Sequence, residues 1–198
     1  MNSKNPIQKM TIAAALSAIG ILIPMFAPKF ILEPASYTLA SHVPIFIAMF
    51  LSPYIAISVA LISAMGFLLA GIFPIAVVLR ALSHIVFVVI GSIMLKKNPK
   101  LLSTVKGTVM FSFLMAVIHS VSEVTVVTLF YWGNNMSSAY YDKGFLFSVI
   151  LLVGVGTVIH SMIDFSIAYA IWKPIQKVVN IPAVSYTHLR AHETAANL

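Results

Sequence analysis

The chain has 198 residues, of which 60% are hydrophobic and only 9% are charged, and its mean hydropathy is +1.01. Because an ordinary soluble domain carries roughly 25% charged residues, this composition excludes a soluble globular protein and predicts one membrane domain that mostly faces lipid. The absence of cysteine excludes disulfides and thiol chemistry, and the net charge of +7 comes from lysines spread over short loops, which indicates membrane orientation and not nucleic-acid binding.

The apolar stretches predict an all-α integral membrane bundle of six transmembrane helices. Between Glu33 and Arg80 lie 46 residues without Asp, Glu, Lys or Arg, and as one helix they would measure about 70 Å, more than twice the roughly 30 Å hydrocarbon core. Proline removes a helix donor, so we expect this stretch to fold back at Ser52 and Pro53. The predicted spans are residues 10–26, 39–51, 54–70, 75–95, 107–131 and 145–172.

The lysines predict the orientation of these spans. Cytoplasmic loops of membrane proteins carry an excess of Lys and Arg. If the N-terminus is cytoplasmic, the outer loops contain only Lys29 and Lys143, so both termini are predicted to be cytoplasmic. The inner segments then contain Lys4, Lys9, Lys96, Lys97, Lys100, Lys106, Lys173 and Lys177.

The end of the chain departs from the membrane pattern. VSYTHLRAHET, residues 184–194, resembles a translated sequencing adaptor. We therefore expect residues 1–182 to form the membrane domain and residues 183–198 to be a non-native tail, and we exclude the tail's His188, Arg190, His192 and Glu193 from the candidate site.

Three pairs of ionisable side chains lie inside the predicted spans. Each pair has i, i+4 spacing and so lies on one helix face: Arg80 with His84, His119 with Glu123, and His160 with Asp164. Such groups are costly in a bilayer and mark functional sites or internal ion pairs. At about 1.5 Å per residue, Arg80 and Glu123 are expected at one level in the outer half of the membrane, His84 and His119 one turn deeper, and His160 and Asp164 deeper still.

This convergence predicts an outward-facing pocket for a small anionic or aromatic solute. Arg80 could hold a carboxylate through paired hydrogen bonds, and the histidines and Glu123 could bond a ring nitrogen. Three alternatives stay open: an Arg80–Glu123 ion pair that only locks two helices, a cross-linking role for His160 and Asp164, and a membrane-interface role for the aromatic residues. The predicted substrate-binding residues are Tyr37, His42, Arg80, His84, His119, Glu123 and Trp132.

The first predicted span has one face with very small side chains. Ala14 and Ala18 form a small-xxx-small step, which allows another helix to approach closely in lipid. The composition leaves open whether this face packs inside the bundle or contacts a second protein.

Five segments carry a resemblance to a known family: LEPASYTLASHVPIF (32–46), LRALSH (79–84), HSVSEV (119–124), SSAYYDKGF (137–145) and GVGTVIHSMIDF (154–165). They resemble the niacin-type substrate-binding component, or S component, of energy-coupling factor vitamin transporters. The resemblance implies a six-helix protein that captures nicotinate at its extracellular side, without a cofactor or bound metal. It also implies a shared module made of one transmembrane coupling protein and two ATPase subunits. The step at Ala14 and Ala18 matches the family's contact with the coupling protein.

Three other interpretations remain at this stage. S components for other vitamins share the fold, so a different small solute is possible. An intramembrane metalloenzyme could use His119, Glu123, His160 and Asp164 as ligands, although no HExxH motif is present. A self-sufficient secondary carrier would usually show internal repeats, which are not evident. The chain has no GxxxxGK[ST] phosphate loop, so ATP hydrolysis by the chain itself is not expected.

Overall fold

The computed structural model describes residues 6–32 and 35–178. Within them, five helices are long and apolar enough to cross a membrane. The last of these runs continuously from the π-helical η2 (Leu146–Val155) into α7 (Gly156–Val178). The other four are α1 (Pro6–Phe26), α3 (Pro53–Ala70), α4 (Ile75–Lys97) and α5 (Val105–Trp132). The predicted helical membrane bundle is confirmed.

The predicted second span differs from expectation. Residues 39–42 form a turn, and α2 (Val43–Leu51) has only nine residues, about 14 Å of helix, too short to cross a 30 Å core. The six predicted spans are therefore not confirmed. The predicted break is confirmed, because α2 ends at Leu51, Pro53 is the first residue of α3, and the Ser52 side chain accepts a hydrogen bond from the Ile55 amide.

A β-hairpin precedes α2 and was not predicted. β1 (Lys29–Leu32) pairs antiparallel with β2 (Ala35–Thr38), and Phe30 lies opposite Tyr37. In β2, Ala35 and Tyr37 are buried and Ser36 is exposed, so one face of this strand packs against the bundle. The fold is thus helical with one two-stranded insertion.

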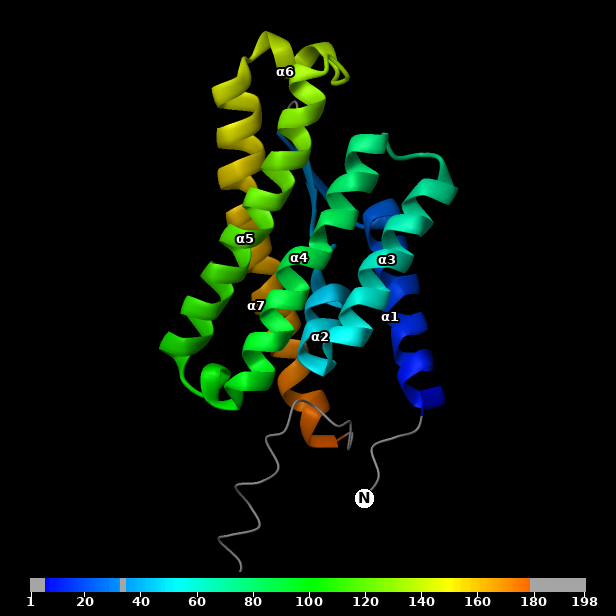
Figure 1. Ribbon diagram of the computed structural model, residues 1–198, viewed down its shortest axis with the longest axis vertical. Coiled ribbons are helices and arrows are strands. Elements are labelled where there is room, and N and C mark those ends of the chain that lie inside the picture. The colour runs from blue at the N-terminus through cyan, green and yellow to red at the C-terminus, as the bar shows by residue number, and fades with distance from the viewer. Residues whose placement is uncertain (1–5, 33–34, 179–198) are drawn as a thin grey trace, which may run out of the picture.

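α2 forms the centre of the bundle (Figure 1). It contacts α1, α3, α4 and α7, and every residue of α2 except Ile47 is buried. Phe46 packs against Phe87 of α4 and Phe165 of α7 with ring centroids 5.4 and 5.3 Å apart. The long helices around it expose apolar side chains on their outer faces, as expected for lipid contact.

The two ends of the bundle differ. The turn between α3 and α4 and the short α6 (Ser138–Asp142) lie at one end (top in Figure 1). The start of α1, the connection between α4 and α5 with η1 (Pro99–Leu102), and the end of α7 lie at the other. The first and last described helices therefore have their outer ends on the same side. The predicted non-native tail, residues 183–198, lies outside the described residues.

Asp164 of α7 fixes the turn that leads into α2. Its Oδ1 accepts a hydrogen bond from the Ala40 amide at 2.8 Å, and its Oδ2 accepts one from the His42 amide at 2.9 Å. The carboxylate is fully buried. Backbone amides that no helix or strand satisfies are costly in a membrane interior, so this side chain makes a non-helical turn possible there.

We predict that Asp164→Asn destabilises the protein by about 1–3 kcal/mol, because an amide group cannot accept from all of these donors and leaves a buried donor unpaired. The measurement is thermal unfolding of the purified protein in detergent. Asp142→Asn is the matched control, since Asp142 is exposed in α6 and its change should leave the unfolding temperature unaltered. Equal unfolding temperatures for Asp164→Asn and the parent would contradict this role.

Candidate functional site

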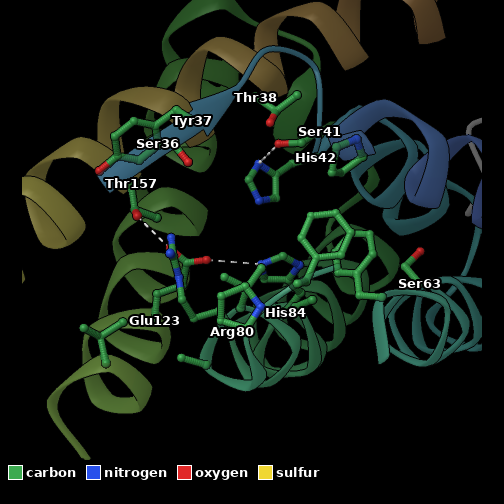
Figure 2. Close-up of a pocket in the computed structure, with 18 of the residues that line it drawn as sticks. Ser36, Tyr37, Thr38, Ser41, His42, Ser63, Arg80, His84, Glu123 and Thr157 are labelled. Carbon is green, nitrogen blue, oxygen red and sulfur yellow. Dashed lines mark hydrogen bonds and ion pairs between the residues drawn. The ribbon is translucent and has the colours of Figure 1, made fainter. Parts of the chain in front are cut away.

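A cavity of about 540 Å³ opens between the hairpin and the end of the bundle that carries α6. Its lining comes from both hairpin strands, the turn before α2 and helices α1 to α7, and Figure 2 shows several of the polar residues that line it. Phe67, Phe73 and Val77 form part of an apolar wall. The cavity therefore combines apolar surface with a few polar groups, as small-molecule sites do.

An ion pair between the half-buried Arg80 and the buried Glu123 lines the cavity. Arg80 Nη2 of α4 donates to Glu123 Oε2 of α5 at 2.8 Å, and Thr157 Oγ1 of α7 donates to the same oxygen at 2.7 Å. The predicted common level of Arg80 and Glu123 is therefore confirmed. The Nε of Arg80 is buried and has no hydrogen-bond partner among the described residues, so one donor of the guanidinium is left unsatisfied.

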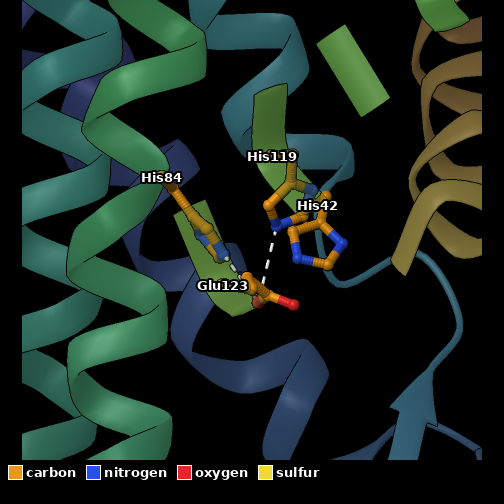
Figure 3. A group of neighbouring side chains, drawn as sticks. All are labelled: His42, His84, His119 and Glu123. Atoms are coloured by element: carbon orange, nitrogen blue, oxygen red, sulfur yellow. Dashed lines mark hydrogen bonds and ion pairs between the residues drawn. The ribbon is translucent and has the colours of Figure 1, made fainter. Parts of the chain in front are cut away.

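Three histidines gather around the other oxygen of Glu123 (Figure 3). Nε2 of His84 and Nε2 of His119 each lie 3.5 Å from Glu123 Oε1. The rings of His42, His84 and His119 lie 4.7 to 4.9 Å from one another. The i, i+4 spacing within single helices predicted that His84 and His119 lie beside this ion pair. The position of His42 depends instead on the turn before α2.

His160 and Asp164 lie closer to this cluster than the sequence predicted. Asp164 Oδ2 is 3.0 Å from His42 Nδ1 and 3.4 Å from His160 Nε2. His42 thus connects the pair to His84 and His119, which corrects the expectation of a separate, deeper level. The ligand set of the alternative metalloenzyme interpretation does not form one group, because His119 and Glu123 group with His42 and His84, whereas His160 and Asp164 group with His42 alone.

The two predicted aromatic residues lie in different places. Tyr37 is buried, lines the cavity, and donates its hydroxyl hydrogen bond to the Leu152 carbonyl of η2. A Cβ at Gly156 would collide with its ring, so glycine is needed for this close approach. Trp132 is 73% exposed, stacks on Phe145 and is not part of the cavity lining.

Sequence reasoning missed Thr157 and Ser161. Thr157 bonds Glu123, and Ser161 Oγ lies 3.2 Å from His119 Nδ1. The signal was present in the sequence, because Thr157 and Ser161 are one turn apart and lie on the same helix as His160 and Asp164. Hydroxyl residues inside an apolar span are therefore worth counting with the charged ones.

The small face of α1 divides into two sides. Ala13, Ser17 and Gly20 are buried against the bundle, whereas Ala14 and Ala18 are exposed. A Cβ at Gly20 would lie 2.8 Å from Ser63 Oγ, so glycine permits the close contact of α1 with α3. The step at Ala14 and Ala18 is left free on the outside of the described bundle.

Comparisons with known proteins identify the family. No family model matches the chain, and no solved structure matches it. The chain is 38% identical over 179 residues to the niacin transporter NiaX of Lactococcus lactis subsp. cremoris (strain MG1363), an alignment that covers 90% of this chain and 79% of the relative. The chain therefore belongs to the family of this niacin transporter, the niacin-type substrate-binding components of energy-coupling factor vitamin transporters, and is not an enzyme.

Proposed function

We propose that this chain is the membrane-embedded binding subunit for the uptake of nicotinate, with the cavity above Arg80 as its binding site. The observation that carries the proposal is a half-buried arginine that lines a partly apolar cavity, in a chain similar to a niacin transporter. An intramembrane ionisable residue is by default a sign of function. A monocarboxylate with one aromatic ring matches both the charge and the apolar wall.

The guanidinium of Arg80 would bind the carboxylate of nicotinate. One of its donors is used by Glu123, which orients the group, and its remaining N–H groups could donate to the solute. Charge-assisted hydrogen bonds are strong in a site from which water is excluded. The pyridine nitrogen would accept a hydrogen bond from a hydroxyl group of the lining, for which Ser41 is a candidate. The alternative is that Arg80 and Glu123 only hold α4 to α5.

We further propose that the cavity opens to the outside of the cell and that both termini are cytoplasmic. The support is that the start of α1, the end of α4, η1, the start of α5 and the end of α7 lie at the end opposite the cavity. These segments carry Lys9, Lys96, Lys97, Lys100, Lys106 and Lys173. Five crossings would place the start of α1 and the end of α7 on opposite sides of the membrane, yet both lie at the same end of the bundle. The hairpin together with α2 would supply the missing crossing, which gives six in total.

Uptake would require an energy-coupling module, in which a transmembrane coupling protein contacts the exposed step at Ala14 and Ala18 and two ATPase subunits supply energy. Exposed small residues on a membrane helix allow close helix–helix packing. The support is the free position of this step on the outer face of α1, together with the family resemblance.

The first prediction of this proposal concerns binding. Arg80→Ala should weaken nicotinate binding by more than about a hundredfold, because removing one partner of a buried charged contact costs several kcal/mol. The parent should bind nicotinamide more weakly than nicotinate, since nicotinamide lacks the charge. Equilibrium binding to the purified protein measures both. Lys143→Ala, an exposed change outside the cavity, is the control. Unchanged nicotinate affinity in a folded Arg80→Ala protein would favour the purely structural ion pair.

The second prediction concerns topology. Reporter fusions at Lys97 should report the cytoplasm, and fusions at Asn135 should report the outside, because these residues lie at opposite ends of α4 and α5. A cytoplasmic Asn135 would place the cavity on the wrong side for uptake and would refute the proposed orientation.

The third prediction separates binding from transport. Replacing both Ala14 and Ala18 with leucine should abolish co-purification with the coupling module and uptake in cells, while nicotinate affinity stays unchanged, because neither alanine lines the cavity. Ser166→Leu adds bulk to an exposed position of α7 and serves as the control. Intact assembly and uptake in the leucine variant would show that this face does not contact the partner.

A further inference from the structure

We propose that His42, His84, His119 and Glu123 bind one divalent transition-metal ion, with zinc as the probe of choice. This site goes beyond the proposed transport function, does not depend on the identity of the solute, and differs from the sequence-based expectation of no bound metal. Three imidazoles and one carboxylate are ligands that zinc accepts readily in proteins.

The spacing of the ligand atoms suits a tetrahedral ion. One ligand atom from each of the four residues lies within 4.8 Å of all the others. With bonds of about 2.0–2.1 Å, neighbouring ligand atoms of tetrahedral zinc lie about 3.4 Å apart. Nε2 of His84 and Nε2 of His119 are each 3.5 Å from Glu123 Oε1, so two edges of the tetrahedron are nearly formed.

The distances between the three imidazole rings also match those expected for ligands of one metal ion. Imidazoles on one tetrahedral zinc have ring centroids about 5 Å apart, given bonds of about 2.0–2.1 Å. The three pairs formed by His42, His84 and His119 measure 4.9, 4.7 and 4.7 Å, with interplanar angles of 70°, 70° and 89°. Only small movements of side chains would bring the nitrogens to one ion.

Neighbouring groups orient the proposed ligands. Metal-binding histidines almost always bond a carboxylate or another acceptor with the second ring nitrogen. Asp164 Oδ2 lies 3.0 Å from His42 Nδ1, and Ser161 Oγ lies 3.2 Å from His119 Nδ1, so each ring can present Nε2 to the ion. Arg80 and Thr157 both donate to Glu123 Oε2, which leaves Oε1 turned toward the histidines.

One buried nitrogen makes no good hydrogen bond. Nε2 of the fully buried His119 has no hydrogen-bond partner among the described residues, and its contact with Glu123 Oε1, at 3.5 Å, is longer than an ordinary hydrogen bond. Buried polar atoms without a partner are rare in proteins and costly. A metal ion would satisfy this nitrogen. His42, His84 and Glu123 line the cavity, so an ion could reach the site from it.

The charges of the cluster favour a cation. Glu123 and Asp164 are two buried carboxylates. Among the described residues, the side chains that pair with them are histidines and one arginine, Arg80. With neutral imidazoles the cluster therefore has a net charge of −1 before an ion binds. Four protein ligands would make a closed site that holds the turn before α2 to α4 and α5.

The test uses the full chain purified in detergent, stripped with a chelator and titrated with zinc chloride alone, without nicotinate. We expect one zinc ion per chain. His84→Gln and His119→Gln should each weaken zinc binding by at least about a hundredfold, since loss of an outer-shell partner alone costs 10–100-fold. The double change His188→Gln and His192→Gln should leave zinc binding unaltered, which would show that the histidines of the tail do not bind the zinc.

A second measurement needs no variant and so does not depend on folding after mutation. Cobalt(II) bound to the unmodified chain should show the strong visible absorption of a four-coordinate ion, and zinc should displace it. The proposal is overturned if zinc does not bind stoichiometrically, if cobalt shows only six-coordinate absorption, or if the tail variant loses binding. Loss in His160→Gln with retention in His84→Gln would assign the ion to His42, His160 and Asp164 and would equally overturn it.

Discussion

The structure depends on placing one carboxylate, that of Glu123, inside a membrane bundle. An isolated charge there would be prohibitive, so the fold brings compensating groups from other helices to it. Arg80 comes from α4 and Thr157 from α7, and both donate to one oxygen of Glu123 on α5. Three long helices are thereby fixed at one level, and the cavity lies where a polar solute can reach the same groups. Stability and the proposed binding therefore use the same atoms.

A second constraint is the non-helical chain before α2. Backbone groups at membrane depth must be satisfied within the protein, and irregular segments are tolerated only where they are buried or line a cavity. The hairpin pairs its own strands, and Asp164 accepts from the amides of Ala40 and His42 in the following turn. The short, apolar α2 then fills the space between the long helices. This arrangement brings His42 from a loop into the centre of the histidine cluster.

Helical periodicity predicted what lies within one helix, and it could not predict what depends on the hairpin. Counting residues along α4 and α5 gave the common level of Arg80 and Glu123, because a fixed rise per residue determines depth in a straight helix. The same count placed Asp164 apart from the other polar groups. It carries no information on the turn at His42, whose amide donates to Asp164 of α7. Trp132 was assigned to the site from its loop position alone, yet its ring stacks on Phe145 outside the cavity. Long-range contacts of short, irregular segments carry no periodic signal.

The most direct test of the central claim is mass spectrometry of the small molecule that co-purifies with the protein from cells grown with niacin. Native and denatured samples of the parent chain should be compared for the bound mass and its stoichiometry. The account predicts nicotinate at one molecule per chain, released on denaturation and exchangeable with added labelled nicotinate. A different solute at that stoichiometry, or an empty protein that fails to bind labelled nicotinate, would contradict it.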